Sequence, residues 1–154
     1  MNIETAIAAN RFGLGARPGE LARIDGRHRD WLLKQIPGPS RTPDVLRSLP
    51  ASAGVLGEVL DLRRNERQAK KRGDDIERRY GKLVRRHYVD QVLARYQLAA
   101  TSEHPFFERL VHFWSNHFAV SADKQPVPAI AGLYENEAIR PHVAGKFAEL
   151  LIAA

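Results

Sequence analysis

One stretch of this sequence, from Phe106 to Phe118, carries too many large apolar side chains for a helix with a single buried side. At about 100° per residue, its apolar positions cover well over half of the helix circumference, which is typical of a helix buried on most sides. The set comprises Phe106, Phe107, Leu110, Val111, Phe113, Trp114, His117 and Phe118. Other elements must pack around this central helix. Because no segment shows the sustained alternation of a strand, we predict an all-α fold.

A long helical hairpin is expected in the middle of the chain. Helical patterns run from Val55 to about Arg72 and from Asp74 to about Thr101, with a break at Gly73-Asp74-Asp75. In the second pattern the apolar residues recur near the helical period, at Val84, Tyr88, Val89, Val92, Leu93 and Tyr96. This stripe predicts that the base of the hairpin packs on the core.

The positive charge of the chain is concentrated in residues 63–86. These residues include eleven Lys and Arg and four acidic residues, a net of +7, whereas the whole chain carries +6. We expect a solvent-exposed basic hairpin tip with Glu66–Lys70 and Asp75–Arg79 ion pairs between successive helical turns. An interaction arm, a nucleic-acid contact or an anionic-membrane contact are the alternatives. The residues expected to form this basic surface are Arg78, Arg79, Lys82, Arg85 and Arg86.

Shorter helical segments account for the rest of what we predict to be a single helical domain over residues 1–154. They are Ile3–Asn10, Glu20–Ile24, Asp30–Ile36, Pro43–Leu49, Ala129–Asn136 and Gly145–Ala154, with a break near Arg140-Pro141. The last segment carries apolar residues at Phe147, Leu150, Leu151 and Ile152 and ends without a capping signal. We therefore expect the N-terminal fragment of a longer protein, with a protein partner or self-association through the Phe147–Ile152 face.

Several classes of function are disfavoured by what the sequence lacks. There is no Cys, which excludes disulfides, thiolate metal sites and cysteine nucleophiles. No apolar run is long enough to span a bilayer, and no signal peptide is visible, so a cytoplasmic location is expected. Gly13-x-Gly15 lacks the strand and the third glycine of a phosphate-binding loop, and we interpret it as a structural turn. Its neighbours Arg11 and Arg17 can contact an acidic partner or the carbonyl ends of helices. No cofactor is predicted.

The central helix carries the best candidates for chemistry. Glu108, His112 and Asn116 follow one another at four-residue spacing and share one stripe. Such a set can act in acid–base catalysis, and Glu108 with His112 can contribute to a metal site, but a structural polar stripe is the favoured interpretation. His117 is rotated by roughly 140° from His112, so the two cannot bind one ion as an i, i+4 pair. We expect His117 to be a hydrogen-bonded core histidine. Glu135 and Glu137 are weaker candidates, since their spacing turns them apart.

Two stretches resemble a known family. They are Arg11-Phe12-Gly13-Leu14-Gly15-Ala16-Arg17-Pro18-Gly19-Glu20 and Phe113-Trp114-Ser115-Asn116-His117-Phe118-Ala119-Val120-Ser121. The sequence is similar in these places to the bacterial domain-of-unknown-function 1800 family. The resemblance implies a helical fold and a longer protein, because members usually continue into further helices. It implies no activity, since none is established for the family.

The leading functional hypothesis is therefore an interaction or scaffolding module. The first alternative is an enzyme whose site is completed by residues outside this chain, with Glu108, His112, Asn116 and His117 contributed from here. The second alternative is a nucleic-acid-binding module that uses the basic hairpin.

Overall fold

The computed structural model describes residues 2–39, 41–74 and 77–154, and the fold in these ranges is helical without strands. The predicted all-α class is thus confirmed. In chain order the helices are α1 (Ile3–Ile7), the π-helix η1 (Ala8–Phe12), α2 (Glu20–Ile24), α3 (His28–Leu33), α4 (Asp44–Arg47), α5 (Ser52–Arg72), α6 (Tyr80–Thr101), α7 (Pro105–His117), η2 (Val127–Ala129), α8 (Ala131–Tyr134), η3 (Glu135–Ile139), η4 (Arg140–His142) and α9 (Phe147–Ala153).

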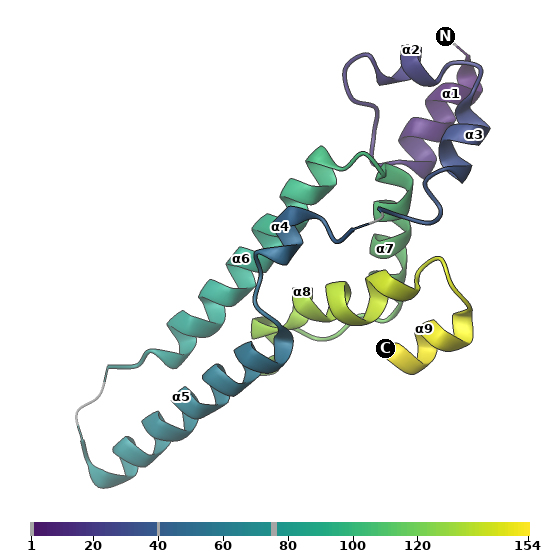
Figure 1. The fold of residues 1–154 in the computed structure, drawn as a ribbon. Coiled ribbons are helices and arrows are strands. Elements are labelled where there is room, and N and C mark those ends of the chain that lie inside the picture. The colour runs from purple at the N-terminus through teal and green to yellow at the C-terminus, as the bar shows by residue number, and fades with distance from the viewer. Residues whose placement is uncertain (1, 40, 75–76) are drawn as a thin grey trace.

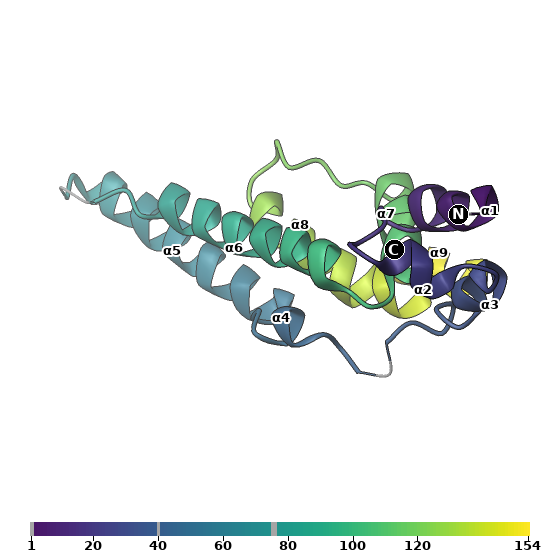
Figure 2. The same ribbon diagram turned by 90° about the horizontal axis from the view of Figure 1, so that it is seen from above.

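The long hairpin of α5 and α6 dominates the shape of the molecule (Figures 1 and 2). Its tip projects at one end, and α1, α2 and α3 gather at the opposite end. The helix α7 lies between these parts, α8 lies along the base of the hairpin, and α9 lies near the lower end of α7, away from the hairpin (Figure 1). In the part of the chain that the structure describes, no helix is long and apolar enough to cross a membrane.

Three small apolar clusters hold these helices together. The first joins α5, α6, η2 and α8 through Val55, Val59, Val84, Ala129 and Leu133. The second joins α7, η3 and α9 through Phe107, Val111, Ile139, Val143 and Leu150. The third packs α4 on α6 through Leu46, Ala94 and Leu98. The base of the hairpin therefore packs on η2 and α8. The apolar core consists of three separate clusters instead of one central cluster.

The turn of the hairpin differs from the prediction. Gly73 adopts a left-handed conformation with φ of +79° and ends α5, as the pattern indicated. However, α6 begins at Tyr80 and not at Asp74. The reason lies in α5, where the Glu66 carboxylate accepts hydrogen bonds from the backbone N–H groups of Arg79 (2.6 Å) and Tyr80 (2.8 Å). The predicted ion pair of Glu66 with Lys70 is therefore replaced by a helix cap. The other predicted pair involves Asp75, which lies outside the described residues.

The predicted apolar stripe of α6 is wrong in most of its members. Val84 is buried, but Tyr88, Val89, Leu93 and Tyr96 are exposed. The buried face of α6 consists instead of Val84, Gln91, Ala94 and Leu98. Gln91 is buried because its amide donates to the carbonyl of Ala129 (2.6 Å) and accepts from the N–H of Gly132 (2.8 Å). A count of apolar residues therefore misidentified the buried side.

The aromatic helix forms as predicted, as α7, but it is not buried on most sides. Its buried residues are Pro105, Phe107, Glu108 and Val111, all in the first two turns, whereas Phe113 in the second half is exposed. The break predicted near Arg140-Pro141 coincides with the end of the π-helix η3 at Ile139. The chain continues there from η3 into the 3₁₀ turn η4, where Pro141 stands in the first turn and needs no intrahelical donor.

Candidate functional site

The polar residues of α7 meet a second set of charges on the C-terminal helices. Glu108 is 1% exposed, and its two carboxylate oxygens accept hydrogen bonds from Nη1 and Nη2 of Arg140, at 2.9 and 2.8 Å. Arg140 also donates from Nε to Asn136 (3.4 Å) and lies 5.9 Å from the Phe107 ring centre. Such a two-pronged, desolvated pair fixes the direction of both side chains. It connects α7 to η4 and leaves neither oxygen of Glu108 without a partner.

A second ion pair lies between α6 and η3. Nε of Arg95 approaches the two carboxylate oxygens of Glu135 at 3.2 and 3.0 Å, and the Glu135 side chain is buried. Glu135 was a weak candidate in the sequence because only its spacing from Glu137 could be judged there. In the structure Glu137 turns away and accepts a hydrogen bond from the backbone N–H of Ser52 (2.8 Å), at the start of α5.

His112 lies beside these two ion pairs and is half-buried. Burial lowers its pKa from the ordinary 6.5, and the nearby Arg95 lowers it further, while Glu135 and Glu108 partly oppose the shift. The imidazole is therefore neutral at pH 7 and able to accept a proton. Its acidic neighbours are each paired with an arginine, so they are not free to act as ligands or bases.

The structure thus places Glu108 and His112 close together, but Asn116 and His117 do not join them. Asn116 is exposed on the last turn of α7. The expectation that His117 is enclosed in the core is wrong, because its side chain is exposed and packs edge-on against Trp114 (5.6 Å) and Phe118 (5.0 Å between ring centres). In the described ranges, no three His, Asp or Glu side chains are placed to hold a metal ion. The acid–base and metal roles stay predictions.

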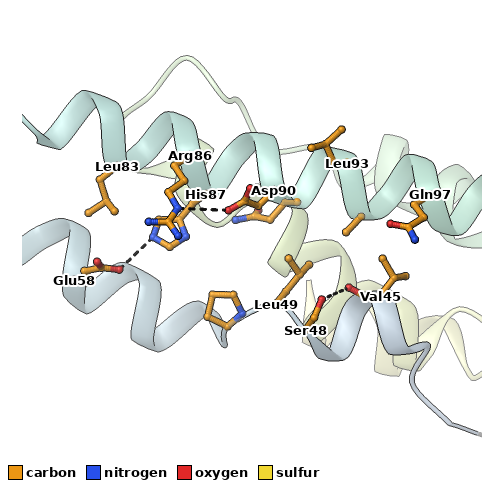
Figure 3. Close-up of a pocket in the computed structure, with 13 residues that line it drawn as sticks. Val45, Ser48, Leu49, Glu58, Leu83, Arg86, His87, Asp90, Leu93 and Gln97 are labelled. Atoms are coloured by element: carbon orange, nitrogen blue, oxygen red, sulfur yellow. Dashed lines mark hydrogen bonds and ion pairs between the residues drawn. The ribbon is translucent and has the colours of Figure 1, made fainter.

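A cavity of about 510 Å³ between α4, α5 and α6 was not anticipated. Figure 3 shows the His87 ring directed toward Glu58, with Nε2 and Oε2 at 3.2 Å, and Arg86 paired with Asp90 at 3.9 Å. Leu49 and Leu83 form part of its apolar wall. In the sequence, only the position of His87 pointed to this cavity. His87 lies three residues after Val84 and four residues before Gln91, on the buried side of α6. The sequence could not show that Glu58 of α5 faces His87. Glu58 is hydrogen-bonded to His87 and Arg86 is paired with Asp90, so the charged groups of this cavity are already engaged with one another.

The segment around Gly13 is hydrogen-bonded to the junction of α6 and α7. The Gly13 carbonyl accepts a hydrogen bond from Arg109 of α7 (3.1 Å), and Arg17 donates to the carbonyl of Thr101 at the end of α6 (3.3 Å). Arg17 thus adopts one of its two expected roles, contact with a helix carbonyl end. Glu20, which is buried, accepts a hydrogen bond from the backbone N–H of Arg17 (3.0 Å). This stretch connects the N-terminal helices to the junction of α6 and α7.

The predicted basic surface is exposed but partly neutralised. Arg79 and Lys82 both contact Glu77, at 3.0 Å each, and Arg86 pairs with Asp90. The hydrogen bonds from Lys82 and then from Arg79 hold the pKa of Glu77 below its ordinary value. Among the described residues, Arg78 and Arg85 of the predicted set form no ion pair, and further unpaired cations lie on α5, a helix that the predicted set did not include.

An aromatic surface forms where the end of α7 meets α9. Its aromatic members are Phe113, Trp114, Phe118 and Phe147, and the exposed Leu151 and Ile152 follow Phe147 on α9. Trp114 lies at its centre, with ring centres 5.1 Å from Phe113, 5.6 Å from Phe147 and 6.0 Å from Phe118. Leu150 of α9 is buried beneath this surface. The sequence identified the α9 part of this surface but assigned the α7 part to the core.

Comparison with known proteins identifies a family whose function is unknown. No curated protein and no solved structure matches the chain. The sequence pattern of one family matches residues 7–154, which is nearly the whole chain and includes every candidate residue discussed above. The chain therefore belongs to a family of proteins of unknown function, DUF1800.

Proposed function

We propose that this domain is an interaction module that associates with a second copy of itself through the aromatic surface of α7 and α9. The observation that carries the proposal is the exposure of that surface. Phe113, Phe147, Leu151 and Ile152 are 59%, 53%, 54% and 86% exposed. Exposed apolar side chains that adjoin one another are typical of protein–protein contacts, whereas scattered ones are not.

The size of the surface is sufficient for a pair of molecules. If a large apolar side chain offers roughly 200 Å² when fully exposed, these four offer about 500 Å² together. A patch of this size is at the upper end for a monomer. Two copies facing each other would bury about 1,000 Å², which is close to the lower limit of specific interfaces. The area therefore favours a weak, specific dimer over a permanent one.

The polar border of the surface also fits a second copy. Lys146 and Glu149 are both exposed beside the apolar residues of α9. In a two-fold pair the same surface meets itself, so Lys146 of one molecule can lie opposite Glu149 of the other. A surface with one charge of each sign complements itself, and this supports self-association over a partner of strong net charge.

Sedimentation velocity tests the proposal at protein concentrations from about 1 µM to about 1 mM, the range of weak interfaces. We expect the natural chain to shift from monomer to dimer, and Leu151→Glu with Ile152→Glu to keep it monomeric. The matched control is Leu93→Glu with Tyr96→Glu, which places the same charges on the equally exposed face of α6 and should leave the dimer intact. A natural chain that stays monomeric throughout, or a control that dissociates equally, contradicts the proposal.

A further inference from the structure

The last turns of α5, together with Gly73, Asp74, Arg78 and Tyr80, line an exposed basic groove. Two adjoining hollows share Arg63, Arg67 and Lys70, and Lys71 borders one of them while Arg78 borders the other. We call these five residues the basic groove. It lies at the projecting end of the hairpin, away from α7 and α9 (Figures 1 and 2).

Two acidic residues, Glu66 and Asp74, also line the second hollow, but each acidic residue that the structure describes in this region already has a partner. The Glu66 carboxylate caps α6 through the N–H groups of Arg79 and Tyr80. Asp74 pairs with Arg72 at 3.2 Å, and Glu77 pairs with residues of the α6 side. Among the described residues, no ion pair is formed by Arg67, Lys70 or Lys71. These three cations are therefore the ones that the groove offers to an anionic partner.

The spacing of these cations is regular because a helix carries them. Arg63, Arg67 and Lys70 or Lys71 follow one another on one side of α5, at about 6 Å per step along the axis. A nucleic-acid strand in a duplex carries one phosphate per about 3.4 Å of axis. A rigid row of this kind can contact about every second phosphate without any change of backbone conformation.

We propose that the basic groove binds the phosphate backbone of nucleic acid without regard to base sequence. A lipid surface fits less well, because an interfacial helix needs a broad apolar face and the groove offers Leu60 and Tyr80 only. Tyr80 is already engaged, with its hydroxyl bonded to Gln125 (3.1 Å) and Arg63 over its ring. For the same reason the groove lacks the free aromatic anchor that a protein partner would use.

Fluorescence anisotropy with a labelled duplex of about 20 base pairs tests the proposal. With three phosphate contacts, the logarithm of affinity should fall with the logarithm of salt at a slope of about −2.7, so binding weakens about 40-fold between about 50 and 200 mM salt. The triple variant Arg67→Glu, Lys70→Glu, Lys71→Glu should bind more than about tenfold more weakly and lose most of this slope.

Matched variants separate the groove from net charge and from damage to the helix. The control Arg29→Glu, Arg41→Glu, Lys124→Glu lowers the net charge equally at exposed positions elsewhere and should keep nearly all of the affinity. If the Glu variant loses helical circular dichroism, replacing the same three groove residues with Gln removes the charge without reversing it, and the loss of affinity should persist. Equal losses in the control and the groove variant overturn the proposal. So does stronger binding to phosphatidylserine vesicles or to polyglutamate than to the duplex.

Discussion

At the scale of single residues, the sequence identified half of the polar site. Glu108 and His112 share a stripe of one helix, and a stripe can be read from spacing alone. Their partners could not be read, because Arg140 is 32 residues from Glu108 in the chain and Arg95 is 40 from Glu135. Spacing within one helix says nothing about which residue of another helix faces it. The sequence therefore predicted a polar edge but could not predict that arginines occupy it.

The lowered pKa of His112 predicts a pH dependence of stability. The unfolded chain has the ordinary pKa of 6.5 and the folded chain a lower one, so below pH 6.5 the unfolded state binds more protons. The free energy of unfolding should therefore fall as the pH decreases below 6.5, by at most about 1.4 kcal/mol per pH unit, until the folded pKa is passed.

His112→Gln should remove this part of the slope, measured by urea unfolding at pH values between about 8 and 5. The matched control is His117→Gln, which removes an exposed histidine of the same helix and should keep the slope of the natural chain. An unchanged slope in the His112→Gln variant would show that the lowered pKa of His112 does not contribute to the pH dependence of the free energy of unfolding.

At the scale of elements, the sequence predicted that the helices exist better than it predicted their ends and faces. Gly73 and the surrounding charges predicted the break of the hairpin, because glycine readily adopts the left-handed conformation that ends a helix. The start of α6 was missed because its cap is supplied by Glu66 of the neighbouring helix. The buried face of α6 was missed because Gln91 is polar, yet it holds the turn before α8. Both errors come from contacts between helices.

Glu66 gives a prediction that belongs to the hairpin as an element. Glu66→Ala removes the acceptor for two backbone N–H groups, so the first turn of α6 should fray and the protein should lose about 0.5–2 kcal/mol. Hydrogen exchange at the amides of Arg79 and Tyr80 should accelerate, and Glu66→Gln should retain part of the protection through its remaining oxygen. Gln68→Ala, on an exposed position of the same helix, is the control. Equal exchange rates in the Glu66→Ala and Gln68→Ala variants would mean that the cap has no effect.

At the scale of the whole molecule, the all-α class and the family were both readable from the sequence, and the distribution of the surfaces was not. The aromatic surface lies where α7 meets α9, and the basic groove lies at the projecting end of the hairpin (Figure 1). No residue belongs to both. A dimer formed through the first surface therefore leaves both basic grooves accessible, and it can hold one long nucleic acid at two points. This combination would make the protein a scaffold.

If both proposals hold, dimer formation should strengthen binding to long duplexes and leave short ones unaffected. Two grooves on one duplex raise affinity through effective concentration, by about 100-fold or more when the geometry permits both contacts. Leu151→Glu with Ile152→Glu should therefore weaken binding to a duplex of about 60 base pairs, about 200 Å long, and should not change binding to one of about 10 base pairs. Anisotropy at a protein concentration above the dimer Kd measures both. A variant that binds both lengths as tightly as the natural chain would show that the two grooves do not act together, and equal weakening at both lengths would show that the two surfaces are not independent.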